Sequence, residues 1–116
     1  MEFRPIEETF EVYSEYAKHS LTISNKTGLL SFYLKNVNLG LEFENQFSIE
    51  QITKITKSNP QYSTIMELTE RVVALIKEKS FYLTTKENAM NIELKIDQDN
   101  IINIILPIHS NKKIIL

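Results

Sequence analysis

The chain has 116 residues, of which 42% are hydrophobic and 24% charged, and it contains no Cys, no Trp and only two Gly. A chain of this length buries about two-thirds of the surface that it exposes when unfolded, so we expect residues 1–116 to form a single globular domain. Thirteen basic and fifteen acidic residues give a net charge of -2, which leaves no basic excess for a phosphate backbone and excludes nucleic acid as the main partner.

The first part of the chain predicts β-structure. Residues 9–16 fit neither the helical nor the strand period and predict a strand or a short helix. Residues 20–24 alternate in polarity, residues 25–28 have turn chemistry, and residues 29–37 are β-rich, so a hairpin follows. Leu39, Leu41 and Phe43 then alternate with Gly40, Glu42 and Glu44. That alternation predicts a half-buried strand with both carboxylates on one face.

The period changes to 3.6 residues at Phe47. Ser48 and Gln51 form a capping box for a short first helix that ends before Pro60. Thr64 and Glu67 repeat this pattern before a second helix, whose apolar stripe consists of Ile65, Leu68, Val72, Leu75 and Ile76.

Strands return after Ser80. Residues 81–85 are β-rich, residues 90–96 alternate strictly, and residues 97–100 form a polar turn. Residues 101–106 are nearly all apolar, which predicts a strand covered on both faces. The order indicates an α+β fold, either an antiparallel β-sandwich or a curved sheet, with an inserted two-helix unit.

The chain has few residues for catalysis or metal binding. His19 and His109 are its only histidines, and we expect both to be exposed loop residues without a carboxylate partner. Asp97 and Asp99 have the spacing that begins a calcium loop, but the Gly and Glu that such a loop requires are missing. We therefore predict no catalytic residue, no metal, no cofactor and no small-molecule substrate.

The ends of the chain lack membrane signals. Glu2, Arg4, Glu7 and Glu8 are unlike the basic start of a signal peptide, and the apolar run at 101–108 is far shorter than the ~20 residues that span a bilayer. We expect a cytoplasmic protein that does not contact a membrane. The apolar end Ile114, Ile115 and Leu116 follows two lysines and predicts an edge strand, or a seam where a partner or a longer chain begins.

The order of elements over residues 20–106 resembles a known superfamily. Strands precede helices that start at Phe47 and Tyr62, and Asn91–Ile96 is followed by a last apolar strand. This arrangement is similar to the globular heads that precede coiled coils, in particular to the head domains of the centriolar cartwheel and DNA end-joining scaffold superfamily. The resemblance implies a non-enzymatic head for dimerisation and scaffolding, a cytoskeletal setting, and, in the cartwheel branch, a head-to-head contact through an apolar residue at the tip of the last hairpin.

The sequence departs from that pattern at two points, because the turn at 97–100 is polar and no heptads follow Leu106. We predict a scaffold head that binds protein, mainly a second copy of itself, as a homodimer or higher oligomer. The expected contact residues are Ile96, Gln98, Asp99, Ile101, Ile102, Ile114, Ile115 and Leu116. The alternative is a stand-alone binding or inhibitor module that uses an exposed sheet edge or the face of Glu42 and Glu44.

Overall fold

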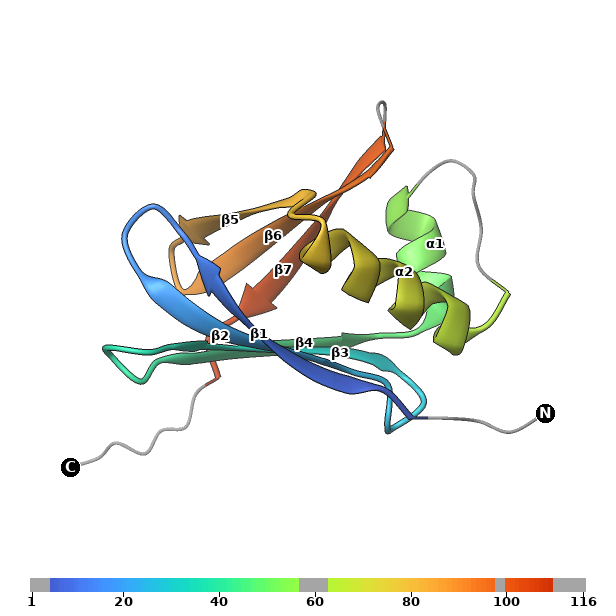
Figure 1. Ribbon diagram of the computed structural model, residues 1–116, viewed down its shortest axis with the longest axis horizontal. Coiled ribbons are helices and arrows are strands. Elements are labelled where there is room, and N and C mark those ends of the chain that lie inside the picture. Colours follow the sequence, from blue (N-terminus) through green and yellow to red (C-terminus); the bar gives the residue numbers. More distant parts are fainter. Residues whose placement is uncertain (1–4, 57–62, 98–99, 110–116) are drawn as a thin grey trace.

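Figure 1 shows a computed structural model of the chain, which describes residues 5–56, 63–97 and 100–109. These residues form two antiparallel sheets and two helices, which confirms the α+β class. The elements are β1 (Glu7–Tyr13), β2 (Lys18–Ser24), β3 (Leu30–Asn36), β4 (Glu42–Phe47), α1 (Ile49–Thr56), α2 (Ile65–Lys77), β5 (Phe81–Lys86), β6 (Ala89–Asp97) and β7 (Asn100–Pro107).

Both sheets are meanders, because each strand pairs with its neighbour in sequence. The first sheet has the order β1-β2-β3-β4 and the second has the order β5-β6-β7. Their β4 and β7 strands meet along one side, where the Asn45 side chain donates to the Ile105 carbonyl at 3.0 Å and Phe43 forms a bridge with Ile108. The other edge strands, β1 and β5, are not paired with each other.

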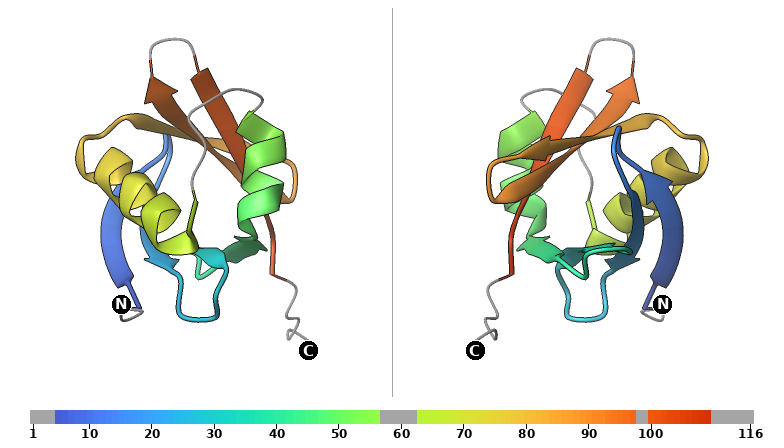
Figure 2. Two further views of the ribbon diagram at one scale, coloured as in Figure 1. Left: turned by 90° about the vertical axis from the view of Figure 1, so that its right-hand side faces the viewer. Right: turned by 90° about the vertical axis from the view of Figure 1, so that its left-hand side faces the viewer.

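The helices lie at one end of the two sheets, as Figures 1 and 2 show. Helix α1 packs on β4 and β7, and α2 packs on β2, β3 and β6. Buried side chains of α2 join those of both sheets in the hydrophobic core, among them Leu68, Val72, Leu75, Ile76, Phe32, Ile92 and Ile104. None of the described helices is both long and apolar enough to cross a membrane.

The two predicted helix starts are confirmed. At α1, Ser48 accepts a hydrogen bond from the Gln51 amide at 3.2 Å, and the Gln51 side chain accepts one from the Ser48 amide at 2.8 Å. At α2, the Thr64 hydroxyl accepts a hydrogen bond from the Glu67 amide at 3.0 Å. These bonds satisfy amide groups that have no partner inside the helix.

The strand predicted through Leu39 and Leu41 is wrong. The Asn36 side chain accepts hydrogen bonds from the amides of Asn38 and Leu39, at 3.0 and 2.8 Å, and Gly40 has a φ of 75°. These bonds fold residues 37–41 into the turn between β3 and β4. The Asn side chain accepts hydrogen bonds from backbone amides that would otherwise bond to a neighbouring strand. Leu39 is consequently 72% exposed and Leu41 41% exposed.

The last strand is also covered differently from our expectation. Ile102, Ile104 and Leu106 are buried, whereas Ile101 and Ile105 are exposed. Strand β7 is therefore buried on one face and exposed on the other. The ambiguous stretch at 9–16 is resolved as the end of β1 followed by a turn.

Candidate functional site

The β6–β7 hairpin holds most of the predicted contact residues. Ile101 is 53% exposed on the outer face of the sheet, whereas Ile96 and Ile102 are buried and belong to the core. Their burial follows from the alternation of side chains along a strand. Gln98, Asp99, Ile114, Ile115 and Leu116 lie outside the described residues.

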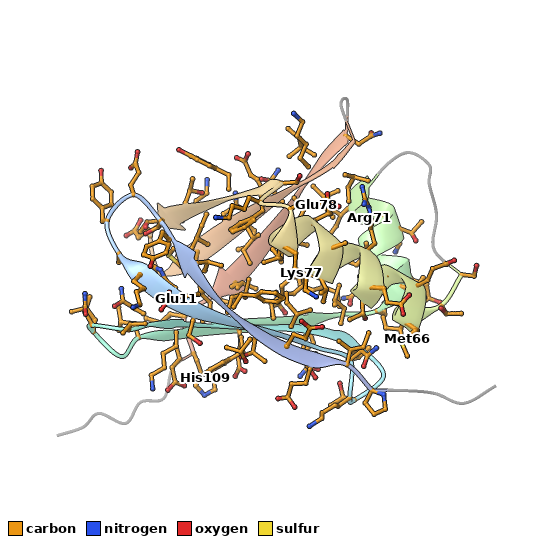
Figure 3. The ribbon with its side chains drawn as sticks, in the orientation of Figure 1. Glu11, Met66, Arg71, Lys77, Glu78 and His109 are labelled. Carbon is orange, nitrogen blue, oxygen red and sulfur yellow. The ribbon has the colours of Figure 1, made fainter. Side chains whose placement is uncertain are left out.

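Helix α2 holds this hairpin near its tip. The Arg71 guanidinium donates a hydrogen bond to the Ile96 carbonyl at 2.8 Å. Figure 3 shows Arg71 projecting from α2 toward the part of β6 that leads into the hairpin tip. Lys95 pairs with Ile101, and the register then shifts before Asp97 pairs with Asn100. Helix α2 thus holds the hairpin close to Ile101, which pairs with Lys95, the residue before Ile96.

Around Ile101, the outer face of the second sheet forms a shallow depression of about 190 Å³. Tyr82 of β5 is 56% exposed there, and Glu93 and Lys95 of β6 lie between Tyr82 and Ile101 in the sheet. We call these four residues the hairpin surface. It combines two exposed apolar side chains with one charge of each sign, a composition suited to contact with protein. Tyr82 is exposed and its neighbour Phe81 is half-buried, because successive side chains of a strand point to opposite faces.

The prediction that His19 is an exposed loop residue is wrong. His19 is 2% exposed and lies in β2 on the same inward face as Leu21 and Ile23. Its Nδ1 atom has no hydrogen-bond partner. Because burial disfavours the charged imidazolium, burial lowers the pKa of His19. The alternation that begins at Ser20 in the sequence extends back to His19, and this was the signal available for its burial.

His109 is exposed, as expected, but it has a carboxylate partner, which corrects the second part of that prediction. Its Nδ1 atom lies 2.7 Å from the Glu44 carboxylate, and both side chains are more than 40% exposed. Figure 3 shows His109 on the side of the first sheet that faces away from the second sheet. The pair lies on an open surface, in contact with solvent.

The carboxylates on the outer face of β4 have local partners. Burial raises the pKa of the Tyr33 hydroxyl, and a hydrogen bond to Glu42 raises it further. On the same face of β4, Glu44 is paired with His109. Among the described residues, no group of three His, Cys, Asp or Glu side chains could hold a metal ion.

Comparison with known proteins shows similarity at the level of structure. No family model matches the chain, and no curated protein matches it. Among solved structures, the head domain of human CCDC61 superposes with a TM-score of 0.68 at 10% sequence identity. The alignment covers 88% of this chain and 99% of that domain. At this identity the similarity establishes a shared fold.

Proposed function

We propose that the chain is a non-enzymatic scaffold head that associates with a second copy of itself. The observation that carries this proposal is the shared fold with the head domain of human CCDC61, which extends over nearly the whole of both domains. The setting that we propose is cytoplasmic and cytoskeletal, with a coiled coil in the same protein.

The contact that we propose uses the hairpin surface and the end of the chain. Ile101 exposes about half of its surface in a hairpin that α2 holds in place. Burying an exposed apolar side chain contributes about 25 cal/mol for each Å² removed from water. A rigidly placed isoleucine loses little conformational entropy on binding, which favours its use as an anchor. Gln98, Asp99, Ile114, Ile115 and Leu116 complete the proposed contact.

Sedimentation velocity over a range of concentrations tests this proposal. We expect the wild-type chain to shift toward a dimer or a larger species as its concentration rises. Ile101→Asp and Ile115→Asp each place a charge in the contact and should shift the chain back toward the monomer. Neither substitution enters the described core, so circular dichroism spectra should remain unchanged.

Leu39→Asp is the matched control. Leu39 is an exposed apolar residue in the β3–β4 turn, which lies at the opposite end of the molecule from the β6–β7 hairpin tip (Figure 1). This variant should associate like the wild type. A wild-type chain that remains monomeric at high concentration, or a Leu39→Asp variant that dissociates as much as Ile101→Asp, would contradict the proposed contact.

A further inference from the structure

The two sheets leave a groove open between their unpaired edge strands. Strands β1 and β5 border it, and the C-terminal end of α2 borders it as well. The groove has a volume of about 430 Å³, within the range of sites that bind ligands. In Figures 1 and 2 the C-terminal end of β1 lies beside β5, on the side of the molecule away from the contact between β4 and β7.

The interior of the groove is apolar. Val12, Ile76 and Leu83 line it and are buried. Phe10 and Phe81 also line it; they pack against the core and are only partly buried. Both phenylalanines share the inward face of their strands with a buried residue, Val12 and Leu83 respectively, and they nevertheless remain partly exposed. The exposed surfaces of Phe10 and Phe81 are therefore apolar core surface that neither sheet covers.

The edge of β5 presents backbone groups to this groove. The Ser80 carbonyl accepts a hydrogen bond from the Lys95 amide at 3.0 Å, and antiparallel pairing alternates residue by residue from that point. Phe81, Leu83 and Thr85 therefore direct their N–H and C=O groups away from β6. No strand of the described chain pairs with this edge. Such an edge is a template for one more extended segment.

The charges at the groove favour an acidic segment. Lys77 and Lys79 stand at its border near the end of α2. The Lys77 ammonium lies 3.5 Å from the Glu8 carboxylate, and Glu11 lies 2.9 Å from Lys18, so these carboxylates are already paired. No carboxylate of the described residues pairs with Lys79. Figure 3 shows Glu11 on β1 and Lys77 on α2, on either side of the groove.

We propose that this groove binds an extended segment of a partner protein in which apolar and acidic side chains alternate. The segment adds a strand to the β5 edge through the backbone groups of Phe81 and Leu83. An apolar side chain enters the groove and covers Phe10 and Phe81, and a neighbouring carboxylate pairs with Lys79. Strand addition of this kind derives affinity from the backbone and specificity from alternate side chains.

Amide NMR titration of the full chain tests the proposal. The probe is a capped peptide of about eight residues in which Val and Phe alternate with Asp. We expect the resonances of Phe81, Leu83 and their neighbours to shift, with affinity in the millimolar range or tighter. Lys79→Glu should weaken binding about fivefold, as expected for one exposed ion pair. Lys86→Glu, at the far end of β5, is the matched control and should bind like the wild type.

Two further peptides separate strand addition from general adhesion. A peptide with Lys in place of Asp should bind at least about fivefold more weakly, because its ammonium group faces that of Lys79. A peptide with the original side chains but N-methylated at the positions that face β5 should also lose binding, because it cannot donate to the β5 carbonyls. Equal binding of either peptide, or an absence of shifts at Phe81 and Leu83 with the original peptide, overturns the proposal.

The outcome is independent of self-association. Ile101→Asp should disrupt the proposed dimer and leave peptide binding intact, because Ile101 does not line this groove. Lys77 lines the groove but not the depression around Ile101. If Lys77→Glu reduces the sedimentation coefficient of the chain in the absence of peptide, a second copy occupies the groove. That result overturns the assignment of the groove to a separate partner.

Discussion

Replacing Leu75 with Ala provides a quantitative test of the core. Leu75 lies in α2, is 1% exposed and belongs to the cluster that joins both sheets. The substitution removes three buried carbon atoms, which at about 0.8 kcal/mol each accounts for about 2.4 kcal/mol. The cavity left behind raises the expected loss in the free energy of unfolding to about 3–5 kcal/mol. That is about a third of the stability of a domain of this size.

Leu39→Ala removes the same atoms from the surface and is the control. Because Leu39 is 72% exposed, its loss should cost less than about 0.7 kcal/mol. Urea unfolding followed by circular dichroism measures both, since the chain has no Trp for fluorescence. With a slope of about 2 kcal/mol/M, the midpoint should fall by about 1.5–2.5 M for Leu75→Ala and hardly change for Leu39→Ala. Similar shifts for the two variants would refute the placement of α2 in the core.

Three other predictions concern local features. Because burial lowers the pKa of His19 in the folded chain, the unfolded chain binds more protons between the two pKa values, so stability should be highest above about pH 6.5 and fall as the pH drops through the folded pKa. His19→Leu should reduce this loss of stability, measured as urea midpoints, whereas His109→Leu should not. Lys79 has a φ of 63°, which favours glycine, so Lys79→Gly should stabilise the chain by about 1 kcal/mol in the same assay. A destabilised variant would show that the interactions of the Lys79 side chain contribute more free energy than its backbone strain costs. Thr64→Ala removes the cap of α2 and should cost about 1 kcal/mol, whereas Thr64→Ser should keep most of it; equal losses would disprove the role of the hydroxyl.

The helices could be predicted from the sequence because their signals are local. The two capping patterns act over three residues, and the apolar stripe of α2 is complete within its own element. The alternation of residues 90–96 was likewise sufficient to predict the central part of strand β6. In these elements the local sequence pattern and the tertiary packing favour the same secondary structure, so the sequence alone was sufficient to predict it.

The errors arose where a side chain decided between two local structures. Leu39 and Leu41 alternate like strand residues, but hydrogen bonds to the Asn36 side chain make the segment a turn. His19 was assigned to a loop because histidine is usually exposed, whereas its register opposite Val12 and Asn36 places it inward. The turn at Leu39 and Leu41 is not visible in a hydrophobic pattern, whereas the burial of His19 follows from the alternation that it shares with Leu21 and Ile23.

The candidate surfaces could be predicted only in part. The hairpin that contains Ile101 was identified from its alternation, but the burial of Ile96 and Ile102 depends on which face of β6 and β7 meets the first sheet. The groove was not predicted, because it exists between strands that are about seventy residues apart and never pair. Sequence patterns describe each strand but not which strand edges remain open.

The meander connectivity of both sheets has a consequence for folding. Every strand pair within a sheet joins neighbours in sequence, so each sheet can form from hairpins with short loops, which close quickly. The contact between Asn45 and Ile105 spans 60 residues and has to wait until both sheets exist. We expect the docking of β4 on β7, with α1 against them, to be the slow step, and substitutions at this seam to change the folding rate more than substitutions within either hairpin.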